Sequence, residues 1–389
     1  MSESTNNKFF EEFPEIDKKN WKEQIIKDLK GADYNEKLIL KSSEGFEIEP
    51  FYNDEDLNDL ESFDKYQGWK AEATVNSLSP RQWENRALIQ VVDPVEANKK
   101  AIFALQNGAD GVSFKFSGPI DANGLSFLLQ DILLEYCAVS FIPAQPILEF
   151  AKLFIEFTKN NQYSSDKLTG SIAANASEFD EDQLVEYMSL FSDFGSYQIF
   201  AISGNAEEAY SKRLGKILAE TIKLIDIMLA KDINVVEVVK KVEFDLNATN
   251  DYFKQIAALR ALRILLDLVV KQYGVSNFDA SQINILATTT VVVDDQTKED
   301  PYMNMLSNTN QAMACIIGGC NALTILPHNL GIEEVKPFAE RIARNVSSVL
   351  KEESYFDKVA DPASGSYYIE SLTNKMAEKS WEQCQSLID

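Results

Sequence analysis

The sequence has little positive charge for its length. Its 389 residues include 37 lysines and arginines against 61 aspartates and glutamates, which gives a formal net charge of −24 at pH 7. Nucleic acid and anionic membrane surfaces attract proteins with an excess of basic groups. This charge balance therefore argues against nucleic-acid and membrane partners.

The sequence also lacks the patterns of metal sites, phosphate loops and export signals. None of its four cysteines, Cys137, Cys315, Cys320 and Cys384, forms a CxxC pair, which predicts reduced structural thiols, no metal and a cytoplasmic location. The Gly318-Gly319 pair stands outside any G-x-G-x-x-G pattern, so it predicts tight packing rather than phosphate binding. The amino terminus has no apolar signal region, and no apolar run reaches about 18 residues, so neither secretion nor membrane spanning is indicated.

The composition and periodicity are those of a globular α/β protein. Apolar residues make up 45% of the chain and aromatic residues 11%, which suffices for a large core. From Ala87 onward, short β-rich runs alternate with helical stretches, a pattern that predicts a parallel sheet. Eight such strands with helices between them predict a (β/α)8 TIM barrel. The candidate strands are 87–93, 111–117, 139–144, 168–176, 196–203, 242–248, 283–290 and 322–328.

We divide the chain into an N-terminal arm (1–80), the barrel (81–370) and a C-terminal helix (371–389). The arm is expected to contain a helix over 18–30 and an extended segment over 45–52. A long N-terminal arm is usually ordered only where it packs against another part of the protein or a partner.

The last helix of the barrel is expected to bury one apolar stripe. Phe338, Ile342, Val346, Val349 and Leu350 recur at steps of three and four, which places them on one face. The polar positions 341 and 344 fall off this stripe. A turn over 361–365 then leads into an apolar run over 367–369.

Several phrases of the sequence resemble the methylmalonyl-CoA mutase family. RIARN, EES and VADPASGSYYIE, within 341–370, resemble the segment that closes the substrate barrel of that family. Asp300-Pro301-Tyr302, followed by Asn304 and by Gly318-Gly319, resembles the same family in the same order. The segment 45–52 resembles the family's phrase before the barrel. Family chains continue into a cobalamin-binding domain, whereas this sequence stops before it, as either a fragment or a chain that ends early.

The resemblance also shows where this chain departs from catalytic members, which use adenosylcobalamin. Catalytic chains carry R-T-H-C-Q-T-S-G on strand seven and G-T-I-Q-N-D on strand four; here Thr288 stands at that histidine and Ala173 at that glutamine. Thr324 stands at a further family histidine. The only histidine, His328, matches part of the cobalamin motif D-x-H-x-x-G, but Leu326 replaces its aspartate, so we interpret this match as chance.

The three substitutions resemble the family's small subunit, which implies no catalytic residue and no cofactor bound by this chain. The resemblance implies a catalytic large subunit as the partner, which carries adenosylcobalamin and interconverts methylmalonyl-CoA and succinyl-CoA. A threonine cannot exchange a proton as an imidazole does. Two alternatives remain: an acyl-CoA mutase chain that binds substrate and works with a separate cobalamin subunit, and a stand-alone binding or structural barrel.

Two predicted strands carry a polar face that we expect to point into the barrel. Strand 111–117 alternates Lys115 with apolar residues, and strand 242–248 alternates Glu243 and Asp245 with apolar residues. A buried charge needs a partner, so we hypothesise that Lys115 pairs with Glu243 or Asp245 inside the bore. The alternative is that Lys115 extends to the barrel mouth and the acids are solvated there.

Overall fold

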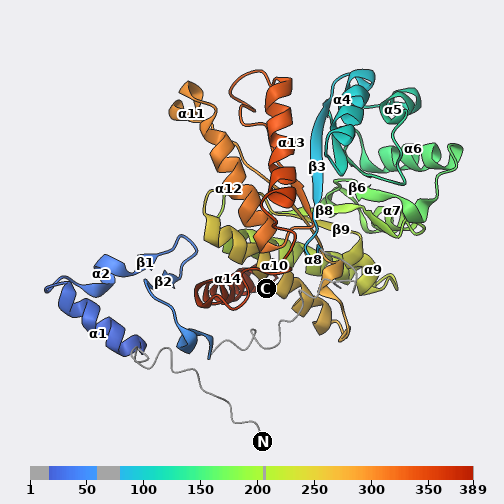
Figure 1. The fold of residues 1–389 in the computed structure, drawn as a ribbon. Helices are drawn as coiled ribbons and strands as arrows, with labels where there is room; N and C mark the ends of the chain where they lie inside the picture. Colours follow the sequence, from blue (N-terminus) through green and yellow to red (C-terminus); the bar gives the residue numbers. More distant parts are fainter. Residues whose placement is uncertain (1–16, 59–78, 205–206, 389) are drawn as a thin grey trace, which may run out of the picture.

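The structure is a computed structural model that describes residues 17–58, 79–204 and 207–388. Figure 1 shows an arm that stands to one side of a larger body of strands and helices. The arm consists of the helices α1 (Lys18–Asp28) and α2 (Tyr34–Leu38), an antiparallel hairpin of β1 (Leu40–Lys41) and β2 (Glu47–Ile48), and the 3-10 helix η2 (Asp54–Leu57). The helix predicted over 18–30 is therefore present and ends at Asp28.

The described strands of the body form a closed ring. Seven of them make one parallel sheet in the order β5-β4-β3-β11-β10-β9-β8, and β6 pairs with β7. A parallel bridge between Phe141 and Ile172 joins β5 to β6. The strands are β3 (Glu84–Val91), β4 (Gly111–Phe116), β5 (Ala138–Ile142), β6 (Thr169–Ser171), β7 (Ser196–Gln198), β8 (Phe200–Ser203), β9 (Val242–Asp245), β10 (Asn284–Thr288) and β11 (Ala322–Thr324).

Only Ile199 separates β7 from β8, so these two strands fill the fifth position of the ring. The amide of Ile199 donates to the carbonyl of Lys241, 2.7 Å away, which joins this position to β9. Eight strand positions therefore close on themselves, and the predicted (β/α)8 barrel is confirmed.

Helices surround the ring. They are α4 (Pro94–Gln106), α5 (Ala122–Leu129), α6 (Ile147–Asn160), α7 (Glu181–Leu190), α8 (Tyr210–Leu229), α9 (Val235–Lys240), α10 (Tyr252–Gln272), α11 (Asp295–Glu299), α12 (Met303–Gly318), α13 (Pro337–Glu352) and α14 (Tyr367–Ile388), with short 3-10 turns at Ser165–Lys167, Ala176–Glu178 and Ala280–Gln282. None of the described helices is long and apolar enough to cross a membrane.

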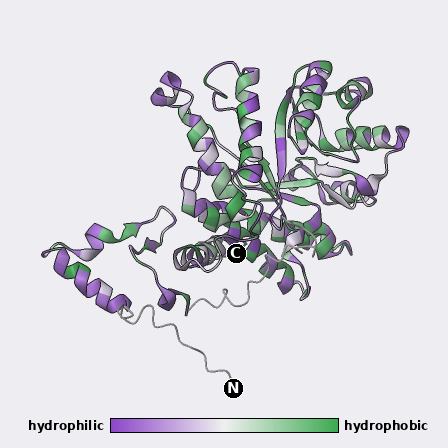
Figure 2. Ribbon diagram, viewed as in Figure 1, coloured by the Kyte–Doolittle hydropathy of each residue, from purple (hydrophilic) through white to green (hydrophobic). Residues whose placement is uncertain are grey.

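Apolar side chains on the outer faces of the strands meet these helices. Phe141 of β5 lies 5.0 Å from Phe150 and 5.1 Å from Phe154 of α6, measured between ring centres, and Phe114 of β4 stacks beside it. Figure 2 shows the hydrophobic colour concentrated in the strands and the helix faces against them, whereas α1 in the arm is largely hydrophilic. The outward direction of the apolar set on 111–117 follows the prediction.

The buried face of α13 differs from the predicted stripe. Phe338 is 46% exposed and Val349 42% exposed, whereas the buried residues include Ala339, Ala343 and Ser347. The Trp83 indole N–H donates to the Ser347 hydroxyl, 2.8 Å away. Small side chains let the helix approach the barrel closely. Leu350 of the predicted stripe is buried as expected, and Arg344, expected off the stripe, is buried as well.

The family-like turn after α13 anchors the final helix. Arg260 of α10 pairs with Asp361 in the turn and with Glu370 in the first turn of α14, the latter at 2.7 Å. The apolar run over 367–369 is the start of α14, which begins earlier than the expected helix at 371–389. Gly318 packs α12 against α10, since a β-carbon there would lie 2.8 Å from the Leu259 side chain.

A carboxylate of the arm caps a helix of the barrel. The N-cap position of α8, Ala209, offers no side-chain oxygen to the first amides of the helix. Glu44, at the tip of the arm hairpin, accepts hydrogen bonds from the amides of Tyr210 (3.2 Å) and Ser211 (2.8 Å) instead. Glu44 is 4% exposed. The arm is thus attached to the mouth side of the barrel through a helix cap that is distant in sequence.

Replacing Glu44 by alanine is expected to lower the free energy of unfolding by about 1 kcal/mol, the usual value of an N-cap. It should also speed hydrogen exchange at the amides of Tyr210 and Ser211, because they lose their acceptor. Glu47→Ala, an exposed position on the same hairpin, is the matched control. Equal exchange rates at these two amides in both variants would contradict the cap.

Candidate functional site

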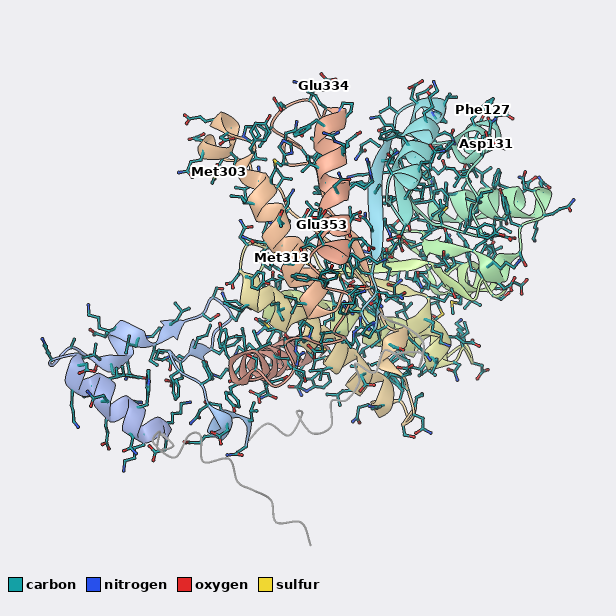
Figure 3. The ribbon with its side chains drawn as sticks, viewed as in Figure 1. Phe127, Asp131, Met303, Met313, Glu334 and Glu353 are labelled. Atoms are coloured by element: carbon teal, nitrogen blue, oxygen red, sulfur yellow. The ribbon has the colours of Figure 1, made fainter. Side chains whose placement is uncertain are left out.

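The carboxyl ends of the strands form the end of the bore where (β/α)8 enzymes place their sites. We call this end the mouth. Helices α12 and α13 follow β10 and β11, so they begin at this end. In Figure 3, Met303 and Glu334 mark it, and Met313 and Glu353 lie toward the other end of the same two helices.

The three substituted positions, Ala173, Thr288 and Thr324, lie at or just after the carboxyl ends of β6, β10 and β11, near the mouth. Thr288 ends β10 and Thr324 ends β11, and the two are register partners. Ala173 directly follows β6 and donates its amide to the carbonyl of Phe141, 2.8 Å away. Because β6 lies opposite β11 in the ring, the structure brings the two threonines together and leaves Ala173 across the bore.

A buried ion pair crosses the bore below this level. Arg86 of β3 and Glu243 of β9 approach to 2.8 Å, with side chains that are 2% and 4% exposed. Glu84 accepts from the Arg86 Nε at 2.8 Å, and the Ser171 hydroxyl donates to Glu243 at 2.9 Å. Since β3 and β9 are not neighbours in the ring, this pair spans the interior and fills the bore at that level.

The electrostatics of Arg86 reflect its two carboxylate neighbours. Burial lowers its pKa, but the charges of Glu243 and then of Glu84 outweigh burial and raise the pKa above its usual value. Gly111, the register partner of Arg86, leaves space for this arrangement. A β-carbon at Gly111 would clash with the Glu84 carboxylate and would lie 2.8 Å from the carbonyl of Ala138.

The ion pair predicted for Lys115 does not form. Lys115 is exposed and is the register partner of Gln90 toward the mouth, whereas Glu243 lies at a deeper level that Arg86 reaches. Among the described residues, neither Glu243 nor Asp245 makes an ion pair with Lys115. Lys115 thus follows the alternative expectation of a side chain at the mouth. Glu243 is buried instead of solvated, and its partner is Arg86, which lies one residue before the predicted strand 87–93.

Asp245 lies on the inner face of β9, one inward position closer to the mouth than Glu243. Burial raises the pKa of Asp245 to about 7, and the negative charge of Glu243 adds to this shift. Its Oδ1 atom is buried and has no hydrogen-bond partner within the described part of the chain. Asp245 is therefore a carboxyl group that changes its charge near neutral pH.

A polar stripe on α12 fixes the loops around the mouth. Asn304, Asn308 and Gln311 are spaced by four and three residues, and all three are buried. The side chain of Asn304 exchanges hydrogen bonds with the backbone of Val292, Asn308 donates to the carbonyl of Leu326 at 2.7 Å, and Gln311 accepts from the amide of Thr290 at 2.7 Å. The spacing of the three amide residues along a helix is a signal that the sequence contains. The family resemblance points only to Asn304, and Asn308 and Gln311 are not predicted from the sequence.

His328 does not fit the role of a cobalamin ligand. It is 5% exposed, and its ring stacks on Tyr302 with 5.2 Å between ring centres. Burial lowers its pKa. An axial ligand must present a free imidazole nitrogen to the cofactor, whereas this ring is covered within the loop after β11. Across residues 17–58, 79–204 and 207–388, no group of three or more His, Cys, Asp or Glu side chains could hold a metal ion.

Sequence comparisons with known proteins point to one family. A family model described as methylmalonyl-CoA mutase matches residues 196–389. The chain is 30% identical to the methylmalonyl-CoA mutase small subunit of Porphyromonas gingivalis, over 98% of this chain and 64% of the relative. It is 26% identical to the small subunit of Streptomyces virginiae, over 95% of this chain and 63% of that protein.

The small subunit of Propionibacterium freudenreichii subsp. shermanii is also 26% identical, over 97% of this chain and 62% of that protein. The chain therefore spans less than two thirds of the length of these relatives. Among solved structures, the L-Ala-D/L-Glu epimerase of Bacillus subtilis aligns at 9% identity over 62% of this chain and 53% of that chain, with a TM-score of 0.33, which is too low to support an inference.

Replacing Arg86 by methionine is expected to lower the free energy of unfolding by about 3–5 kcal/mol, because Glu243 is left as an unpaired buried charge. The double variant Arg86→Met with Glu243→Met should recover most of this loss. Lys99→Met removes an exposed ion pair whose side chains are 65% and 66% exposed, so solvent screening should make its cost much smaller than that of Arg86→Met. Urea unfolding measures all three, and equal costs for Arg86→Met and Lys99→Met would contradict the buried pair.

Asp245 should make stability depend on pH. Between its ordinary pKa of 3.8 and about 7, the folded chain keeps a proton that the unfolded chain has lost. The stability that this proton provides is present at low pH and is lost as the pH rises from about 4 to about 7. Asp245→Asn should therefore gain stability relative to the unsubstituted protein over this window, as measured by urea unfolding at four pH values. A stability difference that stays constant with pH would contradict the raised pKa.

Proposed function

Because the chain belongs to the methylmalonyl-CoA mutase family, we propose that it is the non-catalytic small subunit of a heterodimeric methylmalonyl-CoA mutase. In this proposal a larger partner subunit carries adenosylcobalamin and interconverts methylmalonyl-CoA and succinyl-CoA. The small-subunit names of the three relatives support a larger partner.

The observation that carries the non-catalytic role is the chemistry of the mouth. Ala173, Thr288 and Thr324 offer a methyl group and two hydroxyl groups where catalytic members of the family are expected to carry an amide and two imidazoles. A neutral hydroxyl with a high pKa neither exchanges protons near pH 7 nor donates a hydrogen bond as a cation. The only histidine of the sequence, His328, is buried against Tyr302.

The filled bore supports the same role. The Arg86–Glu243 pair crosses the interior with both side chains almost fully buried. An extended pantetheine arm would need that space, and separating the pair would leave a charge unpaired in the interior. The proposal accordingly assigns the CoA ester to the partner subunit.

The cofactor assignment follows from the poor fit of His328. The Nδ1 atom of His328 has no hydrogen-bond partner in the described part of the chain, but it is buried and the ring stacks on Tyr302. The proposal therefore assigns adenosylcobalamin to the partner. When bound there, the cofactor supplies the radical chemistry of the rearrangement. A cytoplasmic location, suggested by four unpaired cysteines, is part of the same proposal.

The main alternative is an acyl-CoA mutase chain that binds substrate and works with a separate cobalamin subunit. It requires that the isolated chain bind CoA esters. A stand-alone binding or structural barrel is a further alternative, and it requires that the chain form no complex with a catalytic mutase subunit.

Calorimetric titration of the purified chain with methylmalonyl-CoA and then succinyl-CoA, without cobalamin, separates the proposal from the main alternative. The proposal predicts no detectable heat from a folded chain, because the bore is filled and the mouth lacks the catalytic groups. A parallel titration of the catalytic large subunit is the positive control. Stoichiometric binding to this chain would overturn the proposed non-catalytic role and favour the substrate-binding alternative.

A further inference from the structure

A buried arginine near the mouth has donors without acceptors. Arg213, in the first turn of α8, is 0% exposed. Its Nη2 donates to the carbonyl of Asn247 at 2.6 Å, and its guanidinium carbon lies 4.8 Å from the centre of the Tyr210 ring. Its Nε and Nη1 make no hydrogen bond of normal geometry in the described part of the chain. The Tyr210 hydroxyl is near enough to oppose the lowering of the Arg213 pKa by burial. A buried cation without a counter-ion is costly unless something else supplies the charge.

The position of Arg213 follows from the end of β8. Ser203 is the last residue of β8 and the register partner of Asp245 on β9. Strands β8 and β9 end at this same level, and Arg213 contacts the segment that follows β9 at the carbonyl of Asn247. The guanidinium therefore lies at the carboxyl ends of two barrel strands, the location at which (β/α)8 proteins bind their ligands.

Asp245 supplies the second incomplete group in this corner. Its Oδ1 is buried and has no hydrogen-bond partner among the described residues. Arg213 and Asp245 lie close enough to influence each other's charge, yet the two side chains do not form an ion pair. Two unused N–H donors and an unused carboxyl oxygen thus share one corner of the mouth.

We propose that this corner binds a small monocarboxylate between Arg213 and Asp245. A planar carboxylate presents two oxygens to the forked donors of a guanidinium. Asp245 in its protonated form adds an O–H donor to the same anion. A short acid needs no room along the bore, so the Arg86–Glu243 pair does not exclude it.

The surrounding charges favour a monoanion over a dianion. Asp245 faces Glu243 on its own strand, Arg86 of β3 and Arg213 of α8, and Arg213 also lies near Glu44 of the arm and Tyr210. The two glutamates make this corner unfavourable for a doubly charged ligand such as phosphate. Loss of the Asp245 proton adds a further negative charge, so binding should weaken as the pH rises above about 7.

The test uses the whole chain without a partner subunit, with sodium acetate as the probe and calorimetry as the readout. Sodium chloride at the same ionic strength and inorganic phosphate are the comparison salts. We expect saturable acetate binding that is several-fold tighter at pH 6 than at pH 8, with neither comparison salt replacing it. Acetate heats no larger than those of chloride would overturn the proposal.

Variants locate the site. Arg213→Met should weaken acetate binding at least tenfold, whereas Lys212→Met, which removes the same charge from the exposed neighbouring position, should leave it unchanged. Asp245→Asn should bind equally well at pH 6 and pH 8, which keeps the test decisive if Arg213→Met does not fold. Unchanged affinity in Arg213→Met, or an unchanged pH dependence in Asp245→Asn, would overturn the proposal. The result is independent of the proposed subunit role, which concerns CoA esters and a protein partner.

Discussion

The buried Arg86–Glu243 ion pair determines which side chains fit around it in the barrel interior and where a ligand could bind. Two opposite charges meet across the bore at 2.8 Å, and neither can be withdrawn without leaving the other unpaired in a dry interior. Gly111 and Ser171 are fitted around the pair, the first by lacking a β-carbon and the second by donating to Glu243. Any ligand of this barrel must therefore bind above that level, at the mouth.

The parts that shape the mouth are held by polar groups from distant segments. Glu44 caps α8, the amide stripe of α12 fixes the loops after β10 and β11, and Arg260 ties α10 to the start of α14. Each contact satisfies backbone groups or charges that would otherwise be unpaired on burial. Three residues of the family-like phrases, Asn304, Asp361 and Glu370, thus have structural contacts that hold the barrel together.

The sequence predicts the architecture well because strands and helices have local periodicity. The eight strand positions of the barrel follow from it. The interior contacts do not follow in the same way, because Arg86 and Glu243 are far apart in the chain. The start of β3 is also missed, because a search for apolar runs begins at residue 87 and leaves out the charged residues Glu84 and Arg86. On α13, the small residues Ala339 and Ala343 are buried together with Leu350 of the predicted stripe, whereas Phe338 and Val349 are exposed, so the large apolar residues give only part of the buried face.

The proposed subunit role requires a partner that does the chemistry. The most direct test mixes this chain with the catalytic large subunit of a methylmalonyl-CoA mutase and follows both complex mass and succinyl-CoA isomerisation. The account predicts a one-to-one complex, activity that depends on the large subunit and its adenosylcobalamin, and no activity from this chain with the cofactor alone. No complex with that subunit, or turnover by this chain and cofactor alone, would contradict it.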